Sequence, residues 1–516
     1  MDFTLSKEHE MARQLFKEFA ENEVKPLAQE VDETETFPRE TVEKMAKYGF
    51  MGIPVPKEYG GQGCDTLTYA MCVEELSKVC ATTGVIVSAH TSLCIDPIMT
   101  FGTEEQKQKY VPDLASGRKI GAFGLTEPGA GTDAQGQQTK AVLDGDEWVI
   151  NGSKCFITNG KEADVYIVIA VTGIVEKRGR KMKEISSFIV EKGTPGFTFG
   201  TKEKKMGIKG SSTYELIFTD CRIPKENMLG KQGQGFKIAM HTLDGGRIGI
   251  ASQALGIAEG ALERTVAYTK ERKQFGKSIS GFQNTQFQLA DMATKVEAAK
   301  MLVYKAARKK DEYKTNPKIS YSVEAAMAKL YAAEVAMEVT TKAVQLHGGY
   351  GYIREYEVER MMRDAKINME MLDDIQSAKM IPVNIPAFLE DLDGRLKKTL
   401  SGLAPEFDTT EICAEWNRTK EMLEKAAERA ESMEDSDLFL KETVGKLLHI
   451  VYCRKAPYLH DYGDGFGIFG AIGRCKGITK ENTPLDVYVM AGSEYLRMKN
   501  RLCMGLREVQ EQAERI

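Results

Sequence analysis

The sequence lacks several patterns that would define a protein class by themselves. Its ten cysteines include no Cys-x-x-Cys pair, and its six histidines form no ligand-spaced cluster with them, so we expect reduced thiols and no metal site. The most apolar stretch, VYIVIAV, is far shorter than the roughly twenty residues of a membrane-spanning helix. The first residues, MDFTLSKEHEMARQLF, are acidic and amphipathic and do not resemble a secretory signal. A cytoplasmic protein without an integral membrane segment is expected.

An excess of positive charge is also missing. The formal net charge of -5 gives no electrostatic reason to expect nucleic acid as a partner. Hydrophobic residues make up 42% and charged residues 28% of the 516 positions, which is typical of globular proteins. Because the chain is too long for one ordinary core, we expect several packed domains.

The periodicity of apolar residues divides the chain into four predicted domains. Residues 1–119 repeat apolar positions every three or four residues, which predicts a helical N-terminal domain. Residues 120–234 contain short β-rich runs such as VYIVIAVTG and TYELIFTDCRIP, which predict a β domain. Residues 235–385 return to long helical segments suited to a four-helix bundle. Residues 386–516 are predicted to form an additional helical extension.

A glycine-rich motif, FGLTEPGAGTDAQG, begins at residue 123 and is followed by WVINGSKCFITNG from residue 148. Its glycines allow the backbone to approach a flat or phosphorylated ligand, and Thr126 and Thr132 can present hydroxyls to that ligand. A lone glycine-rich turn is more often a simple β-turn than a ligand site. The neighbouring motifs therefore decide the interpretation.

Together with ERKQFGKSISGFQ and QLHGGYGYIREYEVERMMRDAKI, these motifs resemble the acyl-CoA dehydrogenase family of flavoproteins, and most closely its bacterial short-chain, butyryl-CoA types. The resemblance covers residues 2–367 nearly without gaps, with the motifs in the family's order. It implies a mainly α fold with a central β domain: a helical N-terminal domain, a β-barrel-like middle domain and a C-terminal four-helix bundle.

The resemblance further implies FAD bound between the β domain and the bundle, with a second subunit completing the site. Residues that match the β-domain flavin contacts are Phe123, Leu125, Thr126, Thr132, Phe156 and Thr158. Of these, Thr158 would donate near the reactive N5 of the flavin. Residues that match contacts from the neighbouring subunit are Arg272, Gln274, Phe275, Gln283, Gln345, Gly348 and Gly349. The guanidinium of Arg272 suits a phosphate ligand, because its donors form a fixed fork. A shared site implies a homo-oligomer, and the family habit is a dimer of dimers.

The predicted activity follows from the same resemblance. Asp244 and Arg247 match positions on the CoA side of the cleft. The expected function is an FAD-dependent oxidoreductase that interconverts a short-chain acyl-CoA and its 2,3-enoyl-CoA, with electrons passed to an electron-transferring flavoprotein. The sequence leaves the acyl group and the direction of the reaction open.

The catalytic base is where the sequence departs from the family. Removal of the α proton needs a positioned carboxylate, which the family usually takes from a Tyr-Glu-Gly-Thr turn. Here RDAKINMEMLDDIQ is two residues short and lacks the Gly-Thr pair. Counting back from DDIQ places Glu370 at the base position and is slightly preferred. Counting forward from RDAKI places Leu372 there, which leaves Asp373 or Asp374 as a shorter carboxylate. Some relatives place the base in the preceding long helix, but that position is Gly246.

This departure keeps two other interpretations open. The altered loop is compatible with a different reaction on an unusual acyl-CoA, such as elimination or desulfination. It is also compatible with an acyl-CoA or flavin binding scaffold that performs no turnover. Flavin that binds but is not reduced by saturated thioesters would point to one of these two.

Overall fold

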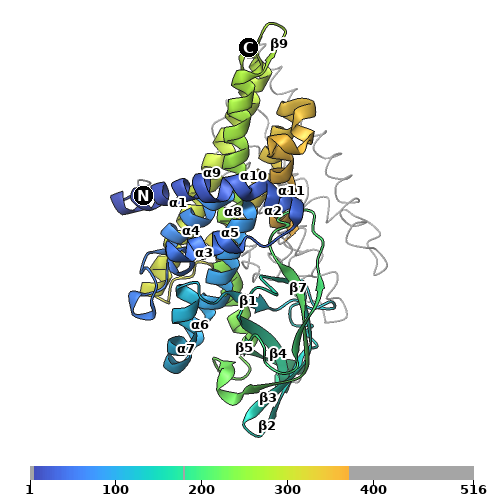
Figure 1. The fold of residues 1–516 in the computed structure, drawn as a ribbon. Helices are drawn as coiled ribbons and strands as arrows, with labels where there is room; N and C mark the ends of the chain where they lie inside the picture. The colour runs from blue at the N-terminus through green and yellow to red at the C-terminus, as the bar shows by residue number, and fades with distance from the viewer. Residues whose placement is uncertain (1–4, 178–179, 371–516) are drawn as a thin grey trace, which may run out of the picture. The chain divides into compact units, whose positions relative to one another are not determined.

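The structure, a computed structural model, describes residues 5–177 and 180–370 of the chain. These residues belong to one compact unit, Met1–Ala378. Along the sequence, helices precede and follow a β sheet, which Figure 1 shows below most of the helices. The predicted order of helix, strand and helix is therefore confirmed. The predicted extension at 386–516 lies outside the described residues.

The N-terminal helices start where their sequences provide side-chain caps. The hydroxyl of Ser6 accepts the N–H of His9, and the carboxylate of Asp65 accepts the N–H of Thr68. Thr103 and Gln106 form a reciprocal capping box at a third helix. The helices are α1 Lys7–Phe19, α2 Ala28–Thr34, α3 Arg39–Lys47, α4 Thr66–Ser77, α5 Ala81–Ser88, α6 Asp96–Phe101 and α7 Glu104–Ala115.

A π-helical segment, Ala89–Ile95, joins α5 to α6 into one apolar stretch. Within the described part of the chain, Ala81–Phe101 is the helix whose length and composition would allow it to cross a membrane. However, 72% of its most apolar window is buried inside the fold. A helix packed in this way has the character of a core helix.

The middle of the chain forms one mainly antiparallel sheet with the strand order β6-β7-β3-β2-β4-β5-β8. Strand β1 pairs with β4 in parallel. The strands are β1 Gly121–Gly124, β2 Lys140–Asp144, β3 Glu147–Thr158, β4 Val165–Lys177, β5 Arg180–Glu191, β6 Phe197–Lys202, β7 Thr213–Pro224 and β8 Met228–Leu229. A turn at Asp144 and Gly145 connects β2 to β3, with Gly145 at a φ of 64°.

Strand β7 shows both the strength and the limit of alternation in the sequence. Leu216 and Phe218 are buried, as expected for one face of an alternating strand, and Tyr214 on the same face is half-buried. Beyond Asp220, whose φ is 47°, the buried positions change phase to Cys221 and Ile223. A local irregularity of this kind moves side chains to the other face of the sheet.

The C-terminal helices confirm the predicted bundle. They are α8 Gly235–Glu271, α9 Gln283–Thr315, α10 Ser322–His347 and α11 Val358–Glu370. Helix α8 has 37 residues and therefore extends over about 55 Å. A short hairpin of β9 Lys273–Gln274 and β10 Lys277–Ser278 follows it.

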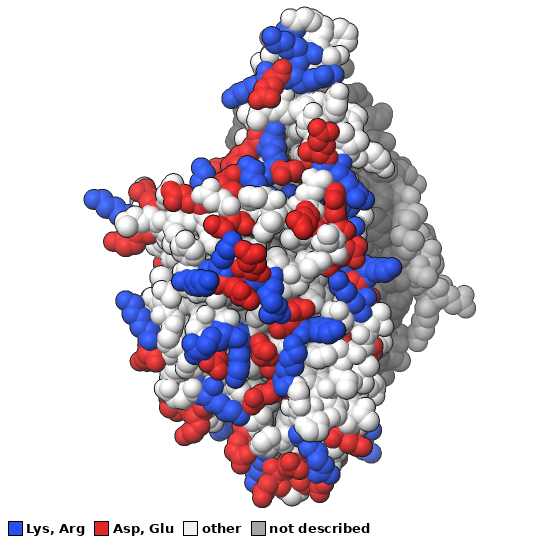
Figure 2. Space-filling model, viewed as in Figure 1, with Lys and Arg blue, Asp and Glu red and all other residues white. Residues whose placement is uncertain are grey.

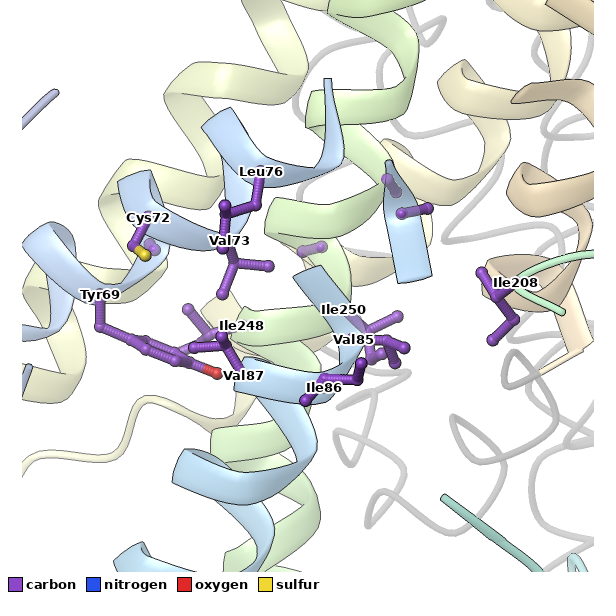
Figure 3. Close-up of a cluster of buried hydrophobic side chains, with 14 of the residues drawn as sticks. Tyr69, Cys72, Val73, Leu76, Val85, Ile86, Val87, Ile208, Ile248 and Ile250 are labelled. Atoms are coloured by element: carbon purple, nitrogen blue, oxygen red, sulfur yellow. The ribbon is translucent and has the colours of Figure 1, made fainter. Parts of the chain in front are cut away.

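The helical layers share one hydrophobic core. Val73 and Leu76 of α4, Ile86 of α5, and Ile248 and Ile250 of α8 belong to one buried cluster, part of which Figure 3 shows. All five side chains are buried. Helix α8 is thus packed directly against the N-terminal helices near its middle.

Buried charges also join these helices. Arg13 of α1 pairs with Glu74 of α4 at 3.2 Å, and Lys78 and Lys300 both pair with Glu259 of α8 at 2.8 and 2.5 Å. Burial and the neighbouring Glu259 raise the pKa of Glu74 well above its usual value. Each buried carboxylate has a cationic partner, as expected for charges removed from water.

The outer surface mixes the two signs of charge. Figure 2 shows acidic and basic side chains intermixed over the face in view.

The change from helix to strand falls between Ala115 and Gly121, and the return to helix falls between Leu229 and Gly235. We propose domain boundaries at 119/120 and 234/235 on this basis. The end of the third predicted domain, 371–385, lies outside the described residues.

Candidate active site

The glycine-rich loop, residues 125–139, connects β1 to β2 and presents its backbone to open space. A Cβ atom added at Gly129 or Gly131 would meet no other atom within 4 Å. Glu127 and Ala130 exchange two backbone hydrogen bonds of 3.1 and 3.0 Å, which make a tight turn. Thr126 is half-buried beside this turn and Thr132 is exposed. The loop can therefore accept a flat or phosphorylated ligand at close approach.

The end of β3 lies beside this loop. The N–H of Cys155 donates to the carbonyl of Thr126 at 2.9 Å. The next residue, Phe156, has a φ of 59° and an aromatic side chain that is 63% exposed. A bulky residue in this backbone region is strained, and such strain is concentrated at functional sites. Thr158 follows at the same end of the strand, opposite Thr213 of β7.

The remaining predicted β-domain residues lie next to the glycine-rich loop. Phe123 and Leu125 are nearly buried, at 9% and 8% exposure. They belong to β1 and to the first residue after it, so they lie directly before the glycine-rich loop. The structure thus places the predicted β-domain residues on the glycine-rich loop, on β1 before it and at the end of β3, which the hydrogen bond from Cys155 to Thr126 joins. We call these segments the sheet edge, meaning the end of β3 and not an outer strand of the sheet.

A buried ion pair under the loop was not singled out from the sequence. The Lys154 ammonium lies 2.7 Å from the carboxylate of Glu127 and is fully buried. Burial lowers the pKa of Lys154 to about 8, although Glu127 opposes this shift. Burial also acts to raise the pKa of Glu127, but Lys154 and backbone donors outweigh it and hold that pKa below its usual value. Glu127 lies in FGLTEPGAGTDAQG and Lys154 lies in WVINGSKCFITNG. A lysine within a predicted strand was the signal in the sequence that could have identified the pair.

The second predicted group lies at the other end of α8. Arg272 follows the last residue of the helix, and its guanidinium lies 5.3 Å from the centre of the Tyr350 ring. Phe275 at the tip of the hairpin has a φ of 51° and is 93% exposed. The hydroxyl of Tyr268 donates to the carbonyl of His347 and joins α8 to the end of α10. The other members of this group are also exposed: Gln274, Gln283, Gln345, Gly348 and Gly349.

The length of α8 separates the two groups within one chain. The helix begins against β5, where a Cβ at Gly235 would meet the backbone of Ser186 at 2.4 Å. It ends at the β9–β10 hairpin. Figure 1 shows the sheet and this hairpin at opposite ends of the ribbon. One chain therefore does not gather all of the predicted flavin residues around a single point.

The predicted CoA-side residues lie on the first part of α8, near the sheet. Asp244 and Arg247 form an ion pair one helical turn apart, and the hydroxyl of Ser322 donates to Asp244 at 2.5 Å. A second pair, Lys310 and Asp96 at 3.0 Å, lies beside this segment, because the Lys310 amine is 2.9 Å from a Cβ placed at Gly245. Sequence reasoning had not identified this second pair.

Gly246 occupies the position where some relatives carry their base. A Cβ added there would lie 2.8 Å from the side chain of Leu93. The apolar neighbour leaves little room for a larger side chain. The site has no carboxylate at this position.

Helix α11, which leads to the predicted base, is held by charged side chains. Arg363 donates to both oxygens of Asp32, at 3.1 and 2.7 Å, and also to Glu359. Asp364 accepts the N–H of Ile208 at 2.5 Å. Burial raises the pKa of Asp364 to about 6. These contacts fix the helix against α2 and against the loop between β6 and β7.

The predicted base lies at the end of this helix. Glu370 is the last residue of α11, and its side chain lies outside the described part of the structure. The fallback residues Asp373 and Asp374 also lie outside the described residues. The base assignment remains a prediction.

Three family models match the chain in sequence order. The acyl-CoA dehydrogenase N-terminal domain matches residues 6–118, the middle domain matches 122–221 and the C-terminal domain matches 233–371. The chain belongs to the acyl-CoA dehydrogenase family.

Within this family the chain is similar to short-chain members. It is 62% identical over 367 residues to the short-chain specific acyl-CoA dehydrogenase of Clostridium acetobutylicum, covering 71% of this chain and 94% of that protein. The solved butyryl-CoA dehydrogenase from Megasphaera elsdenii is 51% identical with a TM-score of 0.68, covering 72% of this chain and 95% of that chain. A chain solved in work on the electron transferring flavoprotein of Acidaminococcus fermentans is 55% identical with a TM-score of 0.68, covering 73% and 100%.

The family match ends close to the predicted base. The C-terminal model stops at residue 371, directly after Glu370. The three model matches therefore include both predicted flavin groups and the CoA-side pair, and they end before Leu372, Asp373 and Asp374.

Proposed function

We propose that the protein is an FAD-dependent acyl-CoA dehydrogenase that interconverts a short-chain acyl-CoA and its 2,3-enoyl-CoA. The observation that carries this proposal is the match to short-chain members through all three domains, with 62% identity over 367 residues. The geometry of the sheet edge supports it independently.

The residues present fit FAD. The glycine-rich loop has open space at Gly129 and Gly131, where a side chain would otherwise occupy the approach to the backbone. Phe156 and Thr158 present an aromatic ring and a hydroxyl at the adjoining edge. FAD, when bound, supplies the acceptor for the hydrogen that leaves the β carbon with its electron pair. The β-domain residues would bind its ring system and exclude water from it.

A second copy of the chain would complete the flavin site. Arg272 and the exposed hairpin lie at the far end of α8 from the sheet edge, so they are available to a neighbouring chain. A guanidinium in such a position suits the paired oxygens of a diphosphate. We infer a homo-oligomer, with a dimer of dimers as the expected arrangement.

The remaining chemistry is assigned to residues at the two other segments. Asp244 and Arg247 would orient the CoA portion of the thioester from the first turns of α8. Glu370 would take the α proton, because burial of a carboxylate beside an apolar substrate raises its pKa toward that of a useful base. The chain would transfer its electrons to an electron-transferring flavoprotein, and we propose a cytoplasmic location.

Anaerobic mixing with a panel of short acyl-CoAs tests the activity and the base together. The parent protein is expected to lose its yellow flavin absorbance with butyryl-CoA. Glu370→Gln should slow this bleaching by about 100-fold or more, because general base catalysis contributes factors of that size. Glu355→Gln, an exposed residue before α11, is the matched control and should bleach at the parent rate.

Other results would assign the chemistry differently. Bleaching that survives Glu370→Gln would move the base to Asp373 or Asp374, and single Asn variants of these would decide between them. A parent protein that binds FAD and thioester without bleaching would contradict the dehydrogenase activity.

The end of the family match at residue 371 favours a second candidate function. Because the Gly-Thr pair is absent, the same scaffold could catalyse an elimination, a desulfination or a base-free reaction of an unusual acyl-CoA, or bind a thioester without turnover. A product formed while the bound flavin stays oxidised would indicate the altered reaction. The absence of any product would indicate binding without turnover.

A further inference from the structure

The ammonium of Lys154 has a complete set of acceptors in the protein interior. It donates to the carbonyl of Leu125 at 3.1 Å, to the carboxylate of Glu127 at 2.7 Å and to the side-chain oxygen of Gln137 at 3.1 Å. An ammonium has three donors, and each has an acceptor here. The group is therefore satisfied as a cation although its side chain has no exposed surface.

These acceptors come from both arms of the glycine-rich loop. Leu125 and Glu127 lie on the arm that leaves β1, and Gln137 lies on the arm that enters β2. Glu127 strengthens the connection, because its carboxylate accepts the N–H of Gln138 at 2.6 Å and the N–H of Thr139 at 3.1 Å. The two arms are thus fastened to each other by one buried pair.

The same lysine also connects the loop to β3. It stands two positions before Phe156, and the intervening Cys155 donates its N–H to the carbonyl of Thr126. Movement of the loop away from Lys154 would separate Thr126 from Phe156. The relative position of these two segments determines the shape of the edge at which a flavin ring would lie.

We propose that Lys154, together with Glu127, is a positioning residue for FAD: the pair clamps both arms of the 125–139 loop and holds the loop against the end of β3. This inference rests on the FAD site of the proposed function. Lys154 acts through Leu125, Glu127 and Gln137.

A role in geometry explains the pair better than a role in stability alone. Desolvation of two charges offsets much of their attraction, so a buried ion pair contributes less to stability than apolar residues of similar size often do. It does fix the positions of its partners, because each hydrogen bond has a narrow range of length and direction. Glu127 and Gln137 lie 27 and 17 residues from Lys154 in the sequence, and the single ammonium nitrogen of Lys154 binds both.

The experiment compares FAD affinity with folding stability in the full-length holoenzyme. Lys154→Met should raise the FAD dissociation constant by about tenfold or more, which corresponds to about 1.4 kcal/mol. FAD released on dilution, followed by ultrafiltration and fluorescence, measures this constant. The visible spectrum of the remaining bound flavin should also shift, because the loop no longer has a fixed position.

A paired variant separates positioning from the cost of an isolated charge. Glu127→Gln with Lys154→Met leaves neither charge unpaired, so its unfolding transition should lie near that of the parent. Its FAD affinity should remain about tenfold weaker, because the ammonium no longer joins the two arms to each other and to β3. If Lys154→Met alone does not fold, this variant decides the question.

Lys140→Met is the matched control. Lys140 is an exposed lysine of β2, directly after the loop, and its replacement should change neither affinity nor spectrum. Parent-like FAD affinity in the paired variant would overturn the inference and leave the pair with a purely structural role. A parent protein that binds no FAD would overturn the proposed function itself.

Discussion

The two ends of helix α8 differ in how completely one chain builds them. At the first end, the sheet edge is fixed by buried side chains and by backbone hydrogen bonds such as Cys155 to Thr126. At the second end, large apolar groups are exposed on three segments: Phe275 of the hairpin is 93%, Phe287 of α9 is 63% and Tyr352 after α10 is 85% exposed. Apolar groups concentrated in this way are typical of surfaces that another protein covers.

The two ends therefore differ in how much of their structure one chain holds in place by itself. The sheet edge receives a strained aromatic residue and a buried ion pair, both of which need surrounding structure to hold them. The hairpin end has exposed apolar side chains, which would be stabilised by burial against the second chain of the proposed oligomer. In the proposed flavin site, one chain would therefore hold the sheet edge in place by itself, and the hairpin end would be completed by a second chain.

The largest expected effect comes from the hairpin end. Phe275→Ser combined with Phe287→Ser should reduce the oligomer to smaller species and cause loss of most of the FAD. Each phenylalanine stabilises an interface by about 1.5–3 kcal/mol when it is buried there. Light scattering during size-exclusion chromatography measures the assembly, and absorbance measures the flavin. Val142→Ser, another exposed apolar residue on β2, should change neither.

A smaller effect is expected on the free energy of unfolding when the pH is lowered, through His90 near β1. The ring of His90 connects α7 to β1, with Nε2 3.1 Å from the carbonyl of Leu114 and Nδ1 accepting the N–H of Gly121 at 2.9 Å. Burial lowers the pKa of His90 to about 4. The unfolded chain takes up this proton near pH 6.5, so the folded protein should lose stability as the pH falls from 6.5 to 4.

The loss should reach about 3 kcal/mol in the free energy of unfolding. Urea denaturation at several pH values measures it. His90→Gln has no ring to protonate and should show a flatter dependence on pH between 6.5 and 4. Identical slopes for parent and variant would contradict this assignment.

The strained aromatic residue should give an effect of about 1 kcal/mol. Phe156→Gly removes a side chain from a backbone with a φ of 59°, and the exposed ring has little packing to lose. We therefore expect higher stability of the flavin-free protein together with weaker FAD binding. Phe156→Ala keeps the Cβ atom and should not gain this stability. Thermal unfolding with and without FAD provides the comparison.

The smallest effect is expected at the outer side of the loop. Lys183 donates to the carbonyls of Gly136 and Gln137 at 2.9 and 2.7 Å from an exposed position on β5. Lys183→Met should cost less than about 1 kcal/mol, because water can replace these bonds. A loss of FAD affinity as large as that for Lys154→Met would show that the loop is held from outside.

The sequence predicted those parts of the fold that depend on local pattern. Helices with a regular apolar repeat and the buried strand VYIVIAV were identifiable because each pattern lies within one element. The change of phase in β7 at Asp220 was not, since an irregular residue leaves the composition of the strand unchanged. The motifs likewise identified the loop, but the local pattern gave no partner for Lys154, which is 27 residues from Glu127.

Features that depend on distant contacts had no local signal. His90 stands in an apolar helical run, and only the fold brings Leu114 and Gly121 to its two nitrogens. Arg363 and Asp364 belong to a recognised motif, but their contacts with Asp32 and Ile208 required the packed structure. The separation of Arg272 from Thr126 depends on the length of an uninterrupted α8, which residue spacing alone did not give.

The length of α8 has a consequence for inheritance. If each chain keeps its own sheet edge and gives its hairpin to a neighbour, a change in the hairpin damages the flavin site of another subunit. Two chains with different defects, one at each end, could then form one intact site between them. Alleles that alter opposite ends of the helix would complement one another. An allele that alters one end would act in a dominant-negative way on subunits that share its site.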